Sequence, residues 1–378
     1  MNSFERFNAV LNHKKPDKVP FYYPTISCTV ASDIMGKIVP AGGDSLHFKE
    51  ELSLLKGENA HKEFLAEHHE VTIELNRLLR ADLIRETWRS NEIPTKMLDE
   101  NTLLFESEKG KSKVKRFYPE TQSYGVVEDG TKPRTVEELK ARLKEEMRSQ
   151  SPKIDSLDLY NEQLRLKKMA KPYFPAIFNA ACPFISIDDP VWLMATILET
   201  DFIAEYLLYR TEIYVKHLAW AAENGYKFIL GGSDIASNSG AIISPEYFGK
   251  LMLKPLQMIS KTCEDNELMY CYRSDGSMWL LMEMIFKKAD IGAFGEVDRD
   301  AGMTVAAVKE KYPNLIILGN VSSAVLHKGS TIQVRTHVKA GLQESGSLNY
   351  IAGPSNMIMP GTPADNVWAM VDEINNYV

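Results

Sequence analysis

The sequence predicts an α/β fold, namely a (β/α)8 TIM barrel with an inserted antiparallel hairpin. Eight short apolar runs alternate with longer helical stretches, and eight βα units close into a barrel. Most of these runs are continuously apolar, which is typical of strands buried on both faces of a parallel sheet. One segment in the first half alternates polar and apolar residues instead, as the strands of a hairpin do.

Each apolar run is a candidate barrel strand. The runs span residues 18–24, 81–86, 173–179, 227–232, 268–272, 290–295, 314–319 and 348–353. A barrel of this kind can occupy the full length of the chain, which has 378 residues. We therefore expect residues 1–378 to form one domain, with a hairpin and helical insertion at about 101–170.

The segments between the runs carry helix signals. In residues 244–265, Ser244 suits the N-cap and Pro245 the first helical position. Residues 101–129 alternate polar and apolar positions around the sequence Glu-Lys-Gly-Lys at 108–111, which predicts a hairpin with its turn there. Residues 134–170 are rich in charge and predict a helical stretch with a solvated face.

Composition limits the classes of partner and compartment. The formal net charge is −7, and this mild acidic excess argues against a nucleic-acid or anionic-membrane partner. The first residues carry charges and no apolar signal-peptide core, and no apolar run approaches the length of a transmembrane helix. We expect a cytoplasmic protein. Four cysteines without a C-x-x-C pair predict free thiols: Cys28, Cys182, Cys263 and Cys271.

Polar residues follow several of the predicted strands. In (β/α)8 barrels the chemistry lies at the carboxyl ends of the strands, so these residues are the candidate site. A carboxylate in this place is often just a helix N-cap, but agreement across five consecutive strand ends favours a site. The candidate catalytic residues are Asp234, Arg273, Asp275 and Glu296. The candidate substrate-binding residues are Asn179, Tyr272, Asn320 and Asn356, while Arg85 and Glu86 end the second run.

Other motifs for cofactors or catalysis are missing from the sequence. It contains no phosphate-binding loop, no dinucleotide-binding glycine motif after a strand, no H-E-x-x-H and no G-x-S-x-G. His68 and His69 lie in a long helical stretch, where neighbouring side chains point to different sides, so we expect no metal site on this pair.

Five blocks along the chain resemble the uroporphyrinogen decarboxylase superfamily, which includes porphyrinogen decarboxylases and the cobamide-dependent methyltransferases of anaerobes. The resemblance covers nearly the whole chain and implies a (β/α)8 barrel. RFNAVLNHKKPDKVPF at 6–21 is similar to the opening helix and first strand, and PGTPADNVWAMVDEI at 360–374 to the closing helix. The central blocks are 231–259, with an acidic residue before a Ser-Pro-Glu helix start, 272–285 and 319–334.

Departures from the family pattern separate its branches. The decarboxylase branch carries an arginine-rich segment after the first strand, whereas residues 22–33 here contain no arginine. The thiol-methylating branch holds zinc through His-x-Cys after strand five and a further Cys after strand eight. The matching positions here are Arg273-Ser274-Asp275 and Pro354-Ser355-Asn356, so the zinc–thiolate set is missing. Zinc, or any other metal, is left open.

The remaining resemblance is to methyltransferases that feed a corrinoid protein, including those that demethylate aromatic methyl ethers. It implies a corrinoid (cobamide) carried by a partner protein and a small methyl donor, with a homodimer left open. A phenolate leaving group, whose phenol has a pKa of about 10, needs a proton or a Lewis acid. Asp234, Asp275 and Glu296 could supply the proton or hold a metal, and Arg273 could stabilise the oxyanion.

Two alternatives stay open at this stage. One is a decarboxylase of a porphyrinogen-like or other carboxylic acid. The other is a non-catalytic barrel that binds a corrinoid or tetrapyrrole, although a bare binding module would not need carboxylates at so many strand ends.

Overall fold

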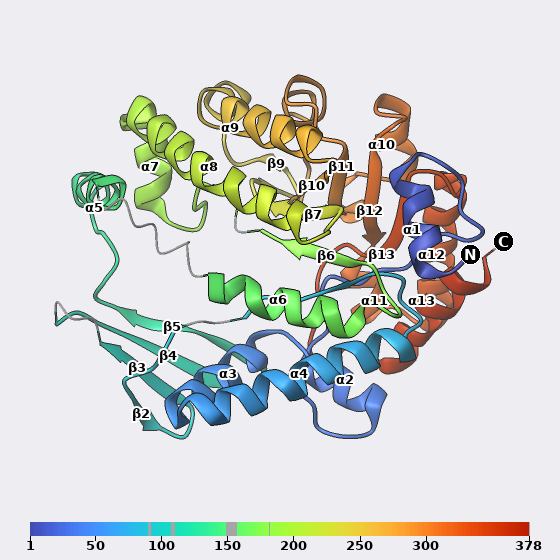
Figure 1. Ribbon diagram of the computed structural model, residues 1–378, viewed down its shortest axis with the longest axis horizontal. Helices are drawn as coiled ribbons and strands as arrows, with labels where there is room; N and C mark the ends of the chain where they lie inside the picture. The colour runs from blue at the N-terminus through green and yellow to red at the C-terminus, as the bar shows by residue number, and fades with distance from the viewer. Residues whose placement is uncertain (90–91, 107–109, 149–156, 181, 378) are drawn as a thin grey trace.

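A curled parallel sheet forms the centre of the computed structural model, which describes residues 1–89, 92–106, 110–148, 157–180 and 182–377 (Figure 1). Its seven strands follow the order β1-β6-β7-β10-β11-β12-β13, and every neighbouring pair is parallel. The strands are β1 (Ile84–Arg85), β6 (Ala176–Asn179), β7 (Phe228–Gly232), β10 (Met269–Arg273), β11 (Ala293–Val297), β12 (Ile316–Val321) and β13 (Tyr350–Pro354). Each of them overlaps one of the predicted runs.

The remaining predicted run, 18–24, is the first in the chain and lies between the two edges of this sheet. Phe21 forms a parallel bridge with Ala352 of β13, and its carbonyl oxygen accepts the N–H of Asp82, just before β1, at 2.7 Å. The run is an extended segment with one bridge rather than a full strand. Pro20 and Pro24 flank it, and proline has no N–H to give to a ladder. The barrel prediction is confirmed.

Helices surround the sheet and close one end of the barrel (Figure 1). They are α1 (Ser3–Leu11), α2 (Cys28–Met35), α3 (Asp44–Lys56), α4 (Glu58–Leu78), α5 (Val136–Arg148), α6 (Leu157–Ala170), α7 (Pro190–Leu198), α8 (Thr200–Glu223), α9 (Pro245–Asp265), α10 (Val305–Lys311), α11 (Ser323–Lys328), α12 (Thr331–Ser345) and α13 (Ala364–Asn376), with a π-helix at Glu283–Lys288 and a 3-10 turn at Arg299–Ala301. Ser244 caps α9 as predicted, because its side chain accepts the N–H of Tyr247.

Side chains alternate between the barrel interior and the layer under the helices. Leu230 of β7 and Cys271 of β10 belong to the interior cluster, which α1 plugs with Phe7 and Val10. Their neighbours along the strands, such as Tyr272, pack in the larger cluster between sheet and helices. Because successive residues of a strand point to opposite faces, the residue after Tyr272 points inward at the end of its strand.

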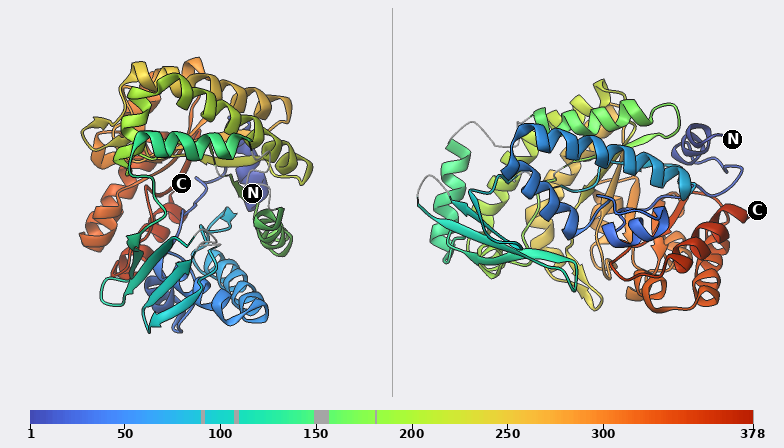
Figure 2. Two further views of the ribbon diagram at one scale, coloured as in Figure 1. Left: turned by 90° about the vertical axis from the view of Figure 1, so that its left-hand side faces the viewer. Right: turned by 90° about the horizontal axis from the view of Figure 1, so that it is seen from below.

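The insertion is larger than the predicted hairpin. It forms a four-stranded antiparallel sheet of β2 (Lys96–Asp99), β3 (Thr102–Glu106), β4 (Ser112–Tyr118) and β5 (Ser123–Asp129), which lies beside the barrel mouth (Figure 2). The prediction missed a second reversal at 119–122, where Gln122 adopts a positive φ of 57°. The predicted turn at 108–111 falls partly on 107–109, outside the described residues.

The helical part of the insertion consists of two helices, α5 and α6, instead of one stretch. Both bury one side, with Leu139 and Leu143 of α5 and Leu166 of α6 almost fully covered. The predicted solvated face is the opposite side of these helices. The four cysteines are free and buried, as expected. Among the described residues, no helix is both long enough and apolar enough to cross a membrane.

The small hairpin of β8 (Ala236–Ser237) and β9 (Gly240–Ala241) completes the described strands and follows β7 at the barrel mouth.

Candidate active site

The barrel mouth is lined by side chains from the carboxyl ends of the strands. Arg85 ends β1, Asn179 ends β6, Arg273 ends β10 and Glu296 lies near the end of β11. Tyr22, from the extended N-terminal segment, lies in the interior cluster directly below them. This is the edge at which catalytic groups of (β/α)8 barrels are found.

Glu296 occupies an unusual backbone position in this ring. The register of β11 against β12 shifts between Gly295 and Val297, and Glu296 has a positive φ of 61°. Such a conformation is uncommon for a residue other than glycine and recurs at functional sites. The Glu296 carboxylate is buried and accepts hydrogen bonds from Nη1 of Arg273 at 3.0 and 3.1 Å. The bulge therefore presents a buried, paired carboxylate to the mouth.

Three carboxylates meet beside this ion pair. Asp234, Asp275 and Glu296 each offer one oxygen atom, and these atoms lie within 4.8 Å of one another. Asp234 is exposed and accepts the backbone N–H of Asp275 at 3.2 Å, while Asn356 donates a hydrogen bond to the Asp275 carboxyl group. The structure thus brings the four predicted catalytic residues and Asn356 together at one mouth.

The cluster holds a proton on Asp275 at neutral pH. Burial, followed by the charges of Glu296, Asp234 and Asp298, raises the pKa of Asp275 to about 8. Burial also raises the pKa of Glu296, although the guanidinium of Arg273 opposes this shift. Three carboxylates this close cannot all be ionised unless a cation lies between them, so one of them keeps its proton when no cation is bound.

Asp275→Asn is expected to stabilise the folded protein at alkaline pH. The pKa of Asp275 is about 8 in the fold against an ordinary 3.8, so the folded state keeps a proton that the unfolded state loses. The stability of the wild type therefore falls as pH rises from 3.8 to 8, and the amide removes this loss. Urea unfolding in EDTA should show a higher free energy of unfolding for the variant at pH 8, with the difference vanishing near pH 4. A variant less stable than the wild type at pH 8 would contradict the assigned protonation.

The cluster also has the donor atoms of a cation site. In the described part of the chain, it is the one group of three His, Cys, Asp or Glu side chains close enough to share an ion. All three donors are carboxylate oxygens, the ligands that hard cations such as Mg²⁺ or Mn²⁺ prefer. A zinc–thiolate site would need cysteine sulfur atoms instead. Cys271 lies in the barrel interior, where burial and the charge of Glu296 raise the pKa of its thiol. It is a poor thiolate ligand.

We expect Cys271 to take no part in metal binding. Cys271→Ser should leave the metal content of the purified protein unchanged, whereas Asp234→Asn should lower any divalent metal that the cluster holds. Elemental analysis of wild type and both variants, after dialysis against Mg²⁺ or Zn²⁺, checks this. Stoichiometric zinc that disappears in Cys271→Ser would refute the assignment.

A pocket of about 360 Å³ opens beside the cluster. Its lining combines aromatic and aliphatic side chains with a few polar and charged ones, as in sites for small molecules. The Trp88 ring lies 5.7 Å from the Arg273 guanidinium, within cation–π range. The pocket is lined by Trp88, Ala180, Cys182, Phe184, Ile185, Ser186, Ile187, Asp188, Gly232, Ser233, Asp234 and Arg273.

Two of the predicted substrate-binding residues lie elsewhere. Tyr272 is 1% exposed and packs between sheet and helices, because it alternates with the inward-facing Arg273. Asn320 is buried as well, and its amide group donates to the carbonyl oxygens of Val297 and Met303. It supports the loop after β11 and has no free donor for a ligand. Of the other two, Asn179 lies at the mouth and Asn356 contacts the carboxylate cluster.

The sequence analysis missed three residues of the site. Tyr22 occupies an inward position of the first run, which the alternation of that run could have indicated. Trp88 follows the Arg85–Glu86 pair by two residues, and Phe184 lies in the segment after β6. No local pattern marks the last two, because their role depends on how loops of different strands meet.

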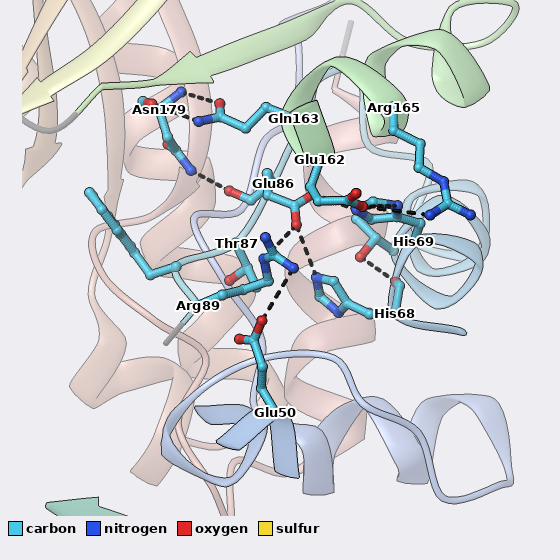
Figure 3. A network of polar contacts seen from close by, with 12 residues as sticks. Glu50, His68, His69, Glu86, Thr87, Arg89, Glu162, Gln163, Arg165 and Asn179 are labelled. Atoms are coloured by element: carbon cyan, nitrogen blue, oxygen red, sulfur yellow. Dashed lines mark hydrogen bonds and ion pairs between the residues drawn. The ribbon is translucent and has the colours of Figure 1, made fainter. Parts of the chain in front are cut away.

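Behind the end of β1, a buried network surrounds Glu86 (Figure 3). Nε2 of His69 lies 2.9 Å from Oε2 of Glu86, and Nε of Arg89 lies 2.9 Å from Oε1. His68 Nε2 is 4.0 Å from the same carboxylate, so the two histidines converge on one group. Both histidines are buried, and their other ring nitrogens face different partners, Pro40 for His68 and Glu162 for His69.

The network fixes the loop that carries Trp88. Arg89 reaches from Glu86 to Glu50 of α3, whose Oε1 lies 3.3 Å from its Nη1. Burial disfavours the charge of Glu86, but the His69 hydrogen bond and the charges of His69, Arg89 and His68 outweigh it and lower its pKa to about 2. Burial lowers the pKa of His68. Residues 86–89 are thus tied to α3 and α4, the two helices that precede the insertion.

Comparisons with known proteins agree with this architecture. The family model described as uroporphyrinogen decarboxylase (URO-D) matches residues 130–377. A search of curated proteins finds no match. A solved methyltransferase from Methanosarcina mazei is similar with a TM-score of 0.66 and 18% identity, covering 99% of this chain and 98% of that chain. A B12-independent methionine synthase from Shewanella sp. W3-18-1 has a TM-score of 0.47 and 10% identity, covering 95% and 96%. At 18% identity, the first likeness is one of fold.

Proposed function

The chain belongs to the uroporphyrinogen decarboxylase family, and we propose on this basis that it is a methyltransferase. Its donor is a small aromatic methyl ether, and its acceptor is a corrinoid carried by a partner protein. The observation that supports this proposal most is a protonated Asp275 in the carboxylate cluster, whose Asp234 and neighbouring Arg273 line a pocket with Trp88 and Phe184.

The pocket suits an aryl donor. Trp88 and Phe184 offer flat apolar surface for a ring, while Asp234 and Arg273 line the same pocket and would contact a polar substituent. A pocket of about 360 Å³ is in the usual range for a small molecule.

The mouth also leaves room for a protein-borne acceptor. Trp88 is 42% exposed and Phe184 is 53% exposed, so the pocket opens to solvent at its aromatic rim. Asp234 and Asn356 are exposed on the same mouth. A Co(I) corrinoid, when bound, supplies the nucleophile that accepts the methyl group. The residues present fit an acceptor that approaches from solvent.

The chain's own residues act on the leaving oxygen. Asp275 holds its proton at neutral pH and would donate it to the ether oxygen as the O–CH₃ bond breaks, so a phenol leaves instead of a phenolate. Arg273 would stabilise charge that develops on that oxygen. Glu296 accepts only from Nη1 of the guanidinium, so the other N–H groups would face the substrate. A cation held by Asp234, Asp275 and Glu296 would replace the proton and act as Lewis acid.

The test is a panel of methyl donors with free cobalamin reduced to Co(I). We expect the cobalt absorbance to change with aryl methyl ethers and not with methanol, methylamine or the same arenes without a methoxy group. Reaction with methanol or methylamine alone would refute the donor class. Carbon dioxide release from a carboxylated arene, without a cobalt change, would favour a decarboxylase.

A further inference from the structure

We propose that Arg85 and Tyr22, with Asn179 as a positioning residue, form a subsite for a carboxylate at the barrel mouth. The assignment of this carboxylate to the methyl donor rests on the proposed function. The donor would then be an aromatic acid that carries a methoxy group.

Arg85 is a buried cation that has no acidic partner in the described part of the chain. It is 7% exposed, and its guanidinium donates from Nε to the carbonyl oxygen of Pro24 at 2.7 Å and from Nη1 to Oδ1 of Asn179 at 2.9 Å. Both acceptors are neutral. Among the described residues, no carboxylate lies within ion-pair distance of this guanidinium.

Other covered arginines of the chain do have such a partner. The distance to the nearest carboxylate oxygen is at most 3.0 Å for each of Arg6, Arg89, Arg273 and Arg299. Among the carboxylates near Arg85, Glu296 raises the pKa of its guanidinium most. Both oxygens of Glu296, however, accept hydrogen bonds from Arg273. A buried cation that lacks a counter-charge is costly, so its presence at a binding site indicates an anionic ligand.

Tyr22 supplies a second unused donor. Its hydroxyl group is buried and has no hydrogen-bond partner among the described residues. Tyr22 lies in the interior cluster of the barrel, and the charges of Arg85, Glu296 and Arg273 all affect the pKa of its hydroxyl group. Buried hydroxyl groups are rarely left unpaired, and one that faces a binding site is explained by a ligand.

Asn179 holds Arg85 in place. Its backbone N–H donates to Oε1 of Gln163 at 2.9 Å, its carbonyl oxygen accepts from Nε2 of Gln163, and its side-chain amide donates to the carbonyl oxygen of Glu86 (Figure 3). All its polar groups are used, so it orients the arginine and leaves the ligand to Arg85 and Tyr22.

The free groups select a carboxylate. A guanidinium donates and never accepts, so the ligand must present acceptor oxygens, and a charged acceptor also balances the arginine. Ala180, which follows Asn179, lines the aromatic pocket together with Arg273. Arg85 and Tyr22 do not line this pocket themselves, so the ligand we propose is an aromatic acid with its ring in the pocket and its carboxylate directed at Arg85.

The test is direct binding of two matched probes, 4-methoxybenzoate and its neutral amide, by isothermal titration calorimetry. We expect wild type to bind the acid roughly 10- to 100-fold more tightly, as for a hydrogen bond to a charged group. Arg85→Gln should abolish this preference and Tyr22→Phe should reduce it. Arg165→Gln, at an exposed arginine paired with Glu162, should leave it unchanged.

Tyr22→Phe removes a hydroxyl group that bonds to nothing described, so this variant should fold even if Arg85→Gln does not. Equal affinity for acid and amide in the wild type, or a preference that survives in both variants, would overturn the subsite. A preference that depends on Arg85 without methyl transfer from any donor would refute the proposed function and leave the subsite standing. Methyl transfer from neutral ethers, together with equal binding of the acid and the amide, would support the proposed function and refute the subsite.

Discussion

Asp275→Asn is expected to lower the rate of methyl transfer by roughly 10²- to 10⁴-fold, the usual contribution of a positioned general acid. The amide keeps the size of the side chain and cannot donate an acidic proton. Donor binding should change little, because in the proposed complex the ring contacts Trp88 and Phe184 and not Asp275. Single-turnover transfer from an aryl methyl ether to Co(I) cobalamin, with donor affinity measured separately, gives both quantities.

The pH profile identifies the acid. Since the pKa of Asp275 is raised to about 8, the rate should fall as pH rises through 8 in the wild type and show no such fall in Asp275→Asn. Asp298→Asn is the matched control, because it removes one of the charges that raise this pKa and should move the fall to lower pH. A near wild-type rate in Asp275→Asn would remove Asp275 as the acid. Loss of rate in Asp234→Asn or Glu296→Gln instead would transfer the role within the cluster.

Glu86→Gln should destabilise the fold by about 3 kcal/mol, since removing one partner of a buried ion pair leaves the others unbalanced. The loss is near the lower end of the range for buried ion pairs, because Arg89 retains its ion pair with Glu50 in the variant. Glu58→Gln, which breaks an exposed pair with Lys62, should have no measurable effect. Urea unfolding at pH 7 checks both variants, and equal stability of Glu86→Gln and wild type would contradict the ion-pair network.

The effect of Glu86 depends on pH in a defined direction. Its pKa is about 2 in the fold against an ordinary 4.5, so the unfolded state binds a proton more readily. The stabilisation is complete above 4.5 and is lost as pH falls from 4.5 to 2. The difference between wild type and Glu86→Gln should shrink over that window.

The periodicity of the sequence predicted the barrel well because buried parallel strands leave a local signal. Each of the five runs in the second half overlaps a strand to within three residues at either end. The first run was harder, since Pro20 and Pro24 reduce it to a single bridge at Phe21. The inserted sheet was underestimated, because its outer strands β2 and β5 face solvent and carry little apolar pattern.

The candidate site was predicted where a strand end determines it. Asp234, Arg273, Asp275 and Glu296 follow or end strands, and the barrel brings such positions together whatever the loops do. Tyr272 failed because a shift of one residue along a strand turns a side chain to the other face. Trp88 and the contacts of Glu86 depend on how α3, α4 and the strand ends pack around the loop after β1, which local sequence does not encode.

The proposed transfer is tested most directly by following one methyl group. An aryl ether with a ¹³C-labelled methoxy carbon is incubated with the protein and an excess of Co(I) cobalamin, and phenol and labelled methylcobalamin are quantified together. We predict one equivalent of labelled methylcobalamin for each phenol released, with both products lost in Asp275→Asn. Phenol without labelled methylcobalamin, or carbon dioxide in place of both, would contradict the account.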